Sequence, residues 1–157
     1  MSSHVIGIDV GGTMIKGALF DSRGALINKD SLPTMADQGK DAFIKNAVTL
    51  IAALSGQGTK VSAVGLGLAG VIDKERSMLC ESPNLPLLQD FPVRKLLESA
   101  LSIPVFLEND ANCAALGELW AGAGKGLENF LFFTVGTGIG SGLILNGRLW
   151  AGEQGKA

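Results

Sequence analysis

The spacing of apolar residues along the chain predicts an alternation of strands and helices. In the first segment apolar residues alternate with Asp9, which is typical of a strand that buries one face. The expected strands are 5–10, 14–20, 25–29, 61–68, 105–108, 130–135 and 143–145. The expected helices are 39–54, a segment that begins near an N-cap at Asp90, and 110–121, which is expected to bury Cys113, Leu116, Leu119 and Trp120. This order predicts an α/β protein.

The 22 glycines gather in three places, at 7–17, 65–70 and 136–147. The stretch "DVGGTMIKGALF" at 9–20 aligns with "TVGTGIGSGLIL" at 134–145, and both predict a strand, a Gly/Thr turn and a second strand. One interpretation is a pair of related lobes whose hairpin tips face each other. The other is that any two glycine-rich hairpins align this well.

The two turns have the chemistry of a nucleotide site. Bare turns expose N–H groups that bind anions, and Thr13 and Thr137 add hydroxyl donors. Asp9 would repel a phosphate about 4 Å away by roughly 4 kcal/mol at an effective dielectric of 20, so its presence predicts a Mg²⁺ ion between them. The alternative is that Asp9 only supports the turn through its own hydrogen bonds.

Polar residues at an expected strand-to-helix junction add candidate catalytic groups. Asn109 and Asp110 lie there, and each alone is read most simply as an N-cap. Beside two phosphate loops, Asp110 becomes a candidate general base for a hydroxyl that attacks a γ-phosphate, with Asn109 orienting that hydroxyl. Asn84, between two prolines, is either a turn former or a polyol ligand.

Composition and charge exclude several classes of protein. A net charge of −2 with 46% hydrophobic and 18% charged residues gives no reason to expect a nucleic-acid or membrane partner. We find neither a signal peptide nor a membrane span, so we expect a cytoplasmic protein with Cys80 and Cys113 as free thiols. "GLGLAG" matches the dinucleotide pattern without a following helix, the phosphate-binding pattern GxxxxGK[ST] is missing, and His4 is the only histidine.

Five motifs in order resemble the ROK family of bacterial sugar kinases and repressors, especially its glucokinases. They are "GIDVGGTMIKGALFD", "GLGLAGVID", "PNLP", "LENDANCAALGE" and "TVGTGIGSGLILNGRLWAG". The resemblance implies an actin-like ATPase, ribonuclease H-like fold, with an N-terminal lobe at 1–110 and a linking helix and the start of a second lobe at 111–157. Ala69 stands where the family more often has proline.

The resemblance also implies roles for individual residues. ATP and Mg²⁺ would be bound by a first phosphate loop, with Asp9 at the metal, and by a second phosphate loop. The first loop holds Asp9, Gly11, Gly12 and Thr13, and the second holds Gly136, Thr137 and Gly138. Asp110 would be the catalytic base, and Asn84, Asn109 and Asp110 would contact the sugar.

The chain departs from the family pattern at "GEQGKA", where the family continues into a Gly-Glu-x-Gly-His segment, a cysteine zinc cluster and the adenosine-binding part. We therefore expect the N-terminal half of an ATP-dependent sugar kinase, inactive alone, with structural zinc only in the missing part, and a homodimer. One alternative is a non-catalytic ROK-type sugar-sensing regulator, whose DNA-binding helices would have no room before Val5. Another is a half-length protein that self-associates through the apolar hairpin at 143–150.

Overall fold

The computed structural model describes residues 3–136 and 138–152 and has three sheets and three α-helices within those residues. The strands are β1 (His4–Val10), β2 (Met14–Phe20), β3 (Leu26–Pro33), β4 (Val61–Leu68), β5 (Val71–Ile72), β6 (Leu79–Glu81), β7 (Val105–Asn109), β8 (Phe130–Val135), β9 (Ile139–Leu145) and β10 (Arg148–Trp150). The helices are α1 (Lys40–Ser55), α2 (Val93–Leu101) and α3 (Asp110–Ala121), with short 3₁₀ helices η1 (Ala36–Gln38) and η2 (Pro86–Leu88).

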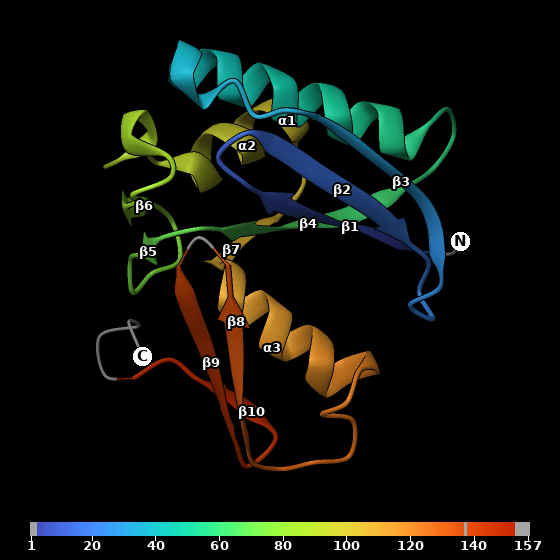
Figure 1. Cartoon of the computed structure of the whole chain (residues 1–157). Coiled ribbons are helices and arrows are strands. Elements are labelled where there is room, and N and C mark those ends of the chain that lie inside the picture. Colours follow the sequence, from blue (N-terminus) through green and yellow to red (C-terminus); the bar gives the residue numbers. More distant parts are fainter. Residues whose placement is uncertain (1–2, 137, 153–157) are drawn as a thin grey trace.

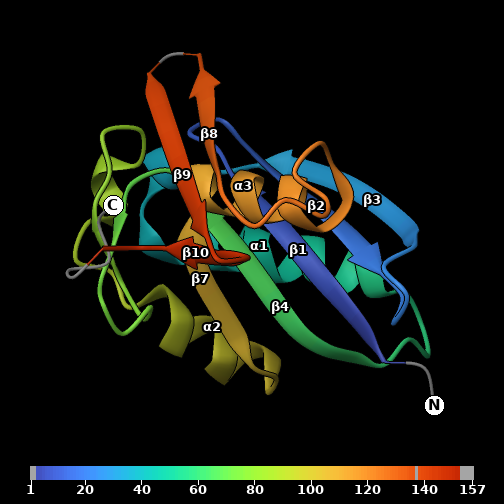
Figure 2. The same cartoon turned by 90° about the horizontal axis from the view of Figure 1, so that it is seen from below.

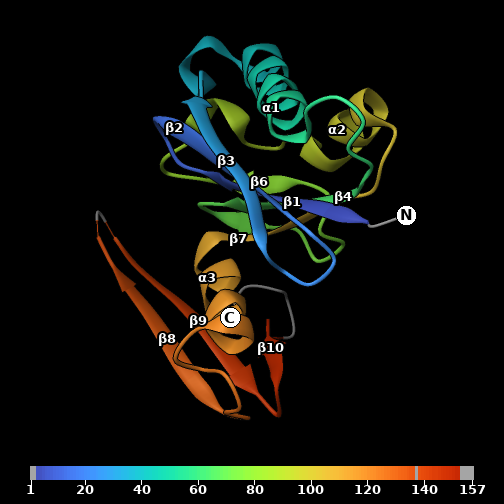
Figure 3. The same cartoon turned by 90° about the vertical axis from the view of Figure 1, so that its right-hand side faces the viewer.

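The main sheet has the strand order β3-β2-β1-β4-β7, and the smaller sheets are β10-β9-β8 and β5-β6. β2 is antiparallel to both of its neighbours, β1 and β3, whereas β4 and β7 run parallel to β1. The α1 and α2 helices cover one face of the main sheet, and α3 lies on the other side together with β8, β9 and β10 (Figures 1 and 2). α3 thus separates the main sheet from the three-stranded sheet (Figure 3).

The hydrophobic core fills the space between the main sheet and the two helices that cover it. Alternation in β1 places Ile6, Ile8 and Val10 in this core and Asp9 on the opposite face, as the pattern predicts. Gly17 of β2 faces the core, where a Cβ atom would lie 2.5 Å from Leu54 Cδ1, so a larger residue there would force the packed side chains of α1 to shift. The opposite face of the sheet, which carries Asp9, borders a cavity.

Most of the predicted elements are confirmed, including the hairpin turn at 146–147, whose two residues have the positive φ angles of 51° and 69° expected of Asn-Gly. The predicted N-cap at Asp90 is wrong, because α2 begins at Val93 after Pro92, and Asp90 lies before it with φ 48°. β4 continues through Gly70 into β5, so no helix follows "GLGLAG" and the dinucleotide pattern has no structural support.

The predicted buried face of α3 is wrong at two of its four residues, whereas Cys113 and Leu119 are partly buried. Leu116 and Trp120 are 37% and 58% exposed, whereas Ala111 and Ala115 are buried. The division into lobes at residue 110 stays a prediction. Within the described residues, none of the helices is long and apolar enough to cross a membrane.

Candidate active site

The tip of the β1–β2 hairpin is held by hydrogen bonds on its inner side. The amide of Gly11 donates to the carbonyl of Met14 (3.0 Å), and the hydroxyl of the fully buried Thr34 donates to the carbonyl of Gly11 (2.6 Å). The Thr34 amide donates to the carbonyl of Thr13 (2.8 Å). Within the described residues, no acceptor pairs with the amides of Gly12 and Thr13. They are therefore available to an anion.

Asp9 lies two residues before Gly11, on the exposed face of β1. Partial burial raises the pKa of its carboxyl above the usual value, the nearby positive charge of Lys16 opposes that rise, and the negative charge of Asp110 adds to it. Asp9 and Asp110 are therefore close enough to repel each other, and a cation between them would relieve the repulsion.

The loop of Asn84 lies directly against the first glycine hairpin. A Cβ atom built on Gly12 would lie 3.1 Å from the carbonyl oxygen of Asn84. The loop is fixed from below by Ser82, which is fully buried, donates to the carbonyl of Ala69, and accepts from the amide of Leu85. A side chain at Gly12 would push this loop away, so glycine at this position permits the close approach.

A polar cavity of about 540 Å³ joins this loop to the second glycine hairpin. Its lining includes Asn84, Asn109, Asp110, Gly136 and Gly138. In the second tip the amide of Gly136 donates to the carbonyl of Gly138 (2.9 Å), which closes the turn between β8 and β9. Thr137 lies outside the described residues, so its predicted hydroxyl contact stays a prediction.

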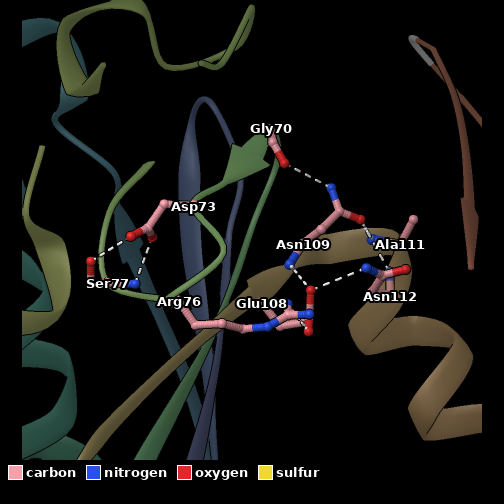
Figure 4. A network of polar contacts seen from close by, with 8 residues as sticks. All are labelled: Gly70, Asp73, Arg76, Ser77, Glu108, Asn109, Ala111 and Asn112. Atoms are coloured by element: carbon pink, nitrogen blue, oxygen red, sulfur yellow. Dashed lines mark hydrogen bonds and ion pairs between the residues drawn. The ribbon is translucent and has the colours of Figure 1, made fainter. Parts of the chain in front are cut away.

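Asn109 is the last residue of β7 and Asp110 the first residue of α3. Figure 4 shows Asn109 at this junction. The Asn109 Oδ1 atom accepts from the amides of Ala111 (2.9 Å) and Asn112 (3.1 Å), so Asn109 is the N-cap of α3. Its Nδ2 atom donates to the carbonyl of Gly70 (3.0 Å) and keeps a second hydrogen for a ligand. Both readings of Asn109 are therefore compatible, because the cap fixes the side chain that would contact the sugar.

A second cavity, of about 1100 Å³, opens over the free face of the main sheet and has Asp9, Lys16, Asp110 and Cys113 in its lining. Asp110 lines both cavities, so it lies between the two amide side chains on one side and Asp9 on the other. Cys113 is not a nucleophile here, because burial and the nearby carboxylates of Glu108 and Asp110 raise the pKa of its thiol to about 12.

Asp9 suits a magnesium ion whose other ligands are phosphate oxygens and waters, and does not suit a metal held only by protein side chains. Across the part of the chain that the structure describes, no group of three or more His, Cys, Asp or Glu residues could hold a metal. Asp9 does provide a hard carboxylate oxygen on the strand that leads into the turn with the unpaired amides, and Mg²⁺ in nucleotide sites typically takes one or two carboxylates plus phosphate oxygens and waters.

Three side chains that the sequence patterns did not indicate support the site. Thr34 holds the first hairpin, and Glu108 holds the β7–α3 junction through an ion pair with Arg76 (Figure 4). Each acts on a residue that is distant in the sequence, so local spacing carries no signal for Thr34 or Arg76. Glu108 is part of the "LENDAN" motif and was the only one a motif could have indicated.

Comparison with known proteins identifies the family. The sequence model of the ROK family matches residues 5–157. This chain belongs to the ROK family. A glucokinase of Halalkalibacterium halodurans is 39% identical over 156 residues, which cover 97% of this chain and 47% of that enzyme. A glucokinase of Thermotoga maritima is 37% identical over 151 residues, with 96% and 47% of the two chains covered.

Solved structures of ROK proteins have the same fold. The ROK family glucokinase from Streptomyces griseus, in complex with glucose and AMPPNP, matches with a TM-score of 0.88 and 34% identity over 97% of this chain and 47% of that one. The ROK hexokinase from Thermus thermophilus matches with a TM-score of 0.88 and 42% identity over 98% and 50%. The predicted family and the actin-like ATPase fold are confirmed.

The chain spans about half the length of the curated relatives it matches. The fold is also shared with a protein of another class, a ROK family transcriptional regulator homologous to the MLC protein of E. coli, with a TM-score of 0.75 over 98% of this chain and 39% of that one. At 19% identity this likeness shows the fold alone.

Proposed function

We propose that this chain forms the N-terminal half of an ATP-dependent sugar kinase that transfers the γ-phosphate of ATP to a hexose hydroxyl. The observation that carries the proposal is the place of Asp110, which lines a polar cavity together with Asn84 and Asn109 and a second cavity together with Asp9. A base between a polyol site and a phosphate site has the arrangement that phosphoryl transfer to an alcohol requires.

Asp110 is the general base in this proposal. Its carboxylate accepts the proton of the attacking sugar hydroxyl, a contribution that is typically about 10²- to 10⁴-fold in rate. The amides of Asn84 and Asn109 hydrogen-bond the sugar hydroxyls and so hold one of them toward Asp110. The cap that fixes Asn109 limits the freedom of the bound sugar.

The two glycine hairpins bind the phosphates of ATP. In the first, Gly12 and Thr13 present unpaired backbone amides, and Gly11, whose amide closes the turn, lets the phosphate approach the backbone. In the second, Gly136 and Gly138 flank Thr137, whose hydroxyl we expect to contribute. Asp9 would hold Mg²⁺ through an oxygen or a bound water. When bound, the ion neutralises charge on the transferred phosphoryl group.

The relatives support both substrates and also the need for a longer chain. A related glucokinase has been solved with glucose and an ATP analogue, and this chain covers 47% of it. We expect the 157 residues alone to turn over little or no substrate, because an adenosine site and the rest of the sugar site would come from the other half. We also expect the protein to be cytoplasmic and a homodimer.

The test is replacement of Asp110 in the complete translation product of the gene. Asp110→Asn should lower kcat for phosphorylation of glucose by about 10²-fold or more while glucose still binds, measured by a coupled ADP assay and by calorimetry. Asp37→Asn is the matched control, because that carboxylate lies in η1 and lines neither cavity. Unchanged turnover in Asp110→Asn would contradict the proposal.

The same experiment separates the kinase from a sugar-sensing regulator. A regulator would bind glucose or a related sugar with no phosphorylation in the unsubstituted protein, and binding would not depend on Asp110 as a base. A "Putative xylose repressor" of Caldicellulosiruptor sp., 28% identical to this chain over 157 residues, favours this alternative.

A further inference from the structure

Glu108 lies immediately before the two residues assigned to the sugar and uses its two carboxylate oxygens for different tasks. Its Oε1 atom accepts from the backbone amide of Asn109 (2.9 Å) and from Nδ2 of Asn112 (3.1 Å). Its Oε2 atom forms an ion pair with a guanidinium nitrogen of Arg76 (Figure 4). One carboxylate thus links the start of α3 to a loop that is 32 residues earlier in the chain.

The loop that carries Arg76 is itself held rigid. Asp73 accepts from the amides of Ser77 and Met78 (2.6 Å each) and from the hydroxyl of Ser77 (2.6 Å). Partial burial opposes ionisation of Asp73, but these hydrogen bonds from Ser77 and Met78 outweigh it and lower the pKa of that carboxyl. Arg76, with φ 54°, is held at the tip of this turn, so its side chain starts from a fixed backbone.

The β5–β6 hairpin therefore touches the β7–α3 junction at two points. Gly70, at the start of β5, accepts from Nδ2 of Asn109, and Arg76, between β5 and β6, pairs with Glu108. The Arg76 and Glu108 side chains are only 30% and 16% exposed, so solvent screens the pair less than it screens a surface pair. Two separate contacts fix both the side chain and the backbone of Asn109.

We propose that Glu108 and Arg76 are positioning residues that hold Asn109 and Asp110 in the geometry needed for phosphoryl transfer; this rests on the proposed function. Loss of the ion pair would let Glu108 turn away from the Asn109 amide and loosen the first turn of α3. The sugar hydroxyl and the base would then meet in the right orientation less often, while the phosphate loops would be untouched.

The alternative is that the pair only stabilises the fold, and a matched pair in the same chain distinguishes the two. Glu98 of α2 accepts from the amide of Val105 (3.1 Å), the first residue of β7, and from Arg94 (3.2 Å). Glu98 holds the beginning of β7 as Glu108 holds its end, but neither Glu98 nor Arg94 lines a cavity. Glu98→Gln is therefore the control for Glu108→Gln.

The variants are Glu108→Gln, which keeps an acceptor for the Asn109 amide, Arg76→Met, Arg76→Lys and the double variant Arg76→Met/Glu108→Gln. In the complete translation product we expect Glu108→Gln and Arg76→Met each to lower kcat with glucose by about 10- to 100-fold and leave the KM for ATP nearly unchanged. The double variant should lose no more than the single variants, and Arg76→Lys should recover part of the rate. Glu98→Gln should keep its rate.

Amide hydrogen exchange measured on the 157-residue chain gives a readout that needs no turnover. Exchange at Asn109, Ala111 and Asn112 should speed up in Arg76→Met and not in Glu98→Gln. Unchanged exchange, additive loss in the double variant, or equal loss in Glu98→Gln would overturn the positioning role. If the unsubstituted complete translation product phosphorylates no sugar, the proposed function fails. Faster exchange in the 157-residue chain would then mark a structural clamp alone, which also overturns the positioning role.

Discussion

The carboxyl of Asp9 lies on the open face of β1, where partial burial and the charge of Asp110 raise its pKa and Lys16 only partly opposes them. A carboxyl with a raised pKa binds its proton more tightly in the folded chain than in the unfolded one. Its ionisation therefore costs stability, and that cost is absent below the usual pKa of 3.8 and complete above the folded pKa. An ionised carboxylate at this position therefore lowers the free energy of unfolding, although the proposed nucleotide site needs it.

The prediction is that Asp9→Asn raises the melting temperature at pH 7, because it removes that cost, and that the gain shrinks as the pH falls toward 3.5. Thermal unfolding followed by circular dichroism at both pH values measures it. In the complete protein the same substitution should abolish most Mg²⁺-dependent kinase activity.

Asp21 provides a control of opposite sign. Hydrogen bonds from the amides of Ala25 and Arg23 lower the pKa of its carboxyl, so ionised Asp21 favours the folded chain at pH 7. Asp21→Asn should lower the melting temperature at pH 7. A lower melting temperature for Asp9→Asn as well would contradict the account of Asp9.

Single residues were predictable where a local motif surrounds them. Asp9 and Asn109 lie in short patterns whose chemistry indicates an anion turn and an N-cap. Thr34 was missed because its partner Gly11 is 23 residues away. Arg76 was missed because its partner Glu108 lies on β7, far along the sequence. Such contacts depend on the strand order, which the apolar spacing does not determine.

At the scale of elements, the packing of α3 on β9 explains why the buried face of the helix was mispredicted. The largest apolar side chains of α3 were expected inside, but glycines at 140 and 142 let β9 approach the helix closely. A Cβ on Gly142 would lie 2.5 Å from the Cβ of Ala115. Only small residues fit this interface, so alanines are buried there. Leu116 stays partly exposed, and the Trp120 ring packs edge-on against Phe20 of β2 instead of against β9.

This packing predicts opposite effects for two Gly-to-Ala substitutions. Gly142→Ala should destabilise the chain by about 1–3 kcal/mol, because the added methyl overlaps Ala115. Gly117→Ala, in the interior of α3 with nothing within 4 Å of the added Cβ, should stabilise it by up to about 1 kcal/mol. Urea denaturation gives both values, and stabilisation by Gly142→Ala would contradict the close α3–β9 contact.

At the scale of the whole molecule, the main sheet and the three-stranded sheet differ in the residues on their edge strands. β3 is an edge of the main sheet and carries Lys29 and Asp30, which discourage pairing with another strand. β8 is an edge of the smaller sheet, has no charged residue, and exposes Leu131, Phe133 and Val135 at 52%, 59% and 85%. The uncovered apolar surface predicted for 143–150 is thus more pronounced on β8.

An apolar edge strand of this kind is what a further segment of protein or a second copy of the chain would cover. We therefore predict that the 157-residue chain self-associates at concentrations of tens of micromolar. Phe133→Lys places a charge in the middle of the β8 edge and should shift the molar mass measured by light scattering toward the 16.2 kDa of one chain.

The matched control is Ile27→Lys, which places the same charge on the β3 edge at a residue that is 55% exposed. Because β3 already carries charged residues, this substitution should leave the molar mass of the assembly unchanged. A clean 16.2 kDa species in the unsubstituted chain would contradict self-association. If both variants dissociate the assembly, the contact is not specific to the β8 edge. If Phe133→Lys alone dissociates the assembly, the β8 edge is the surface through which copies of the 157-residue chain meet.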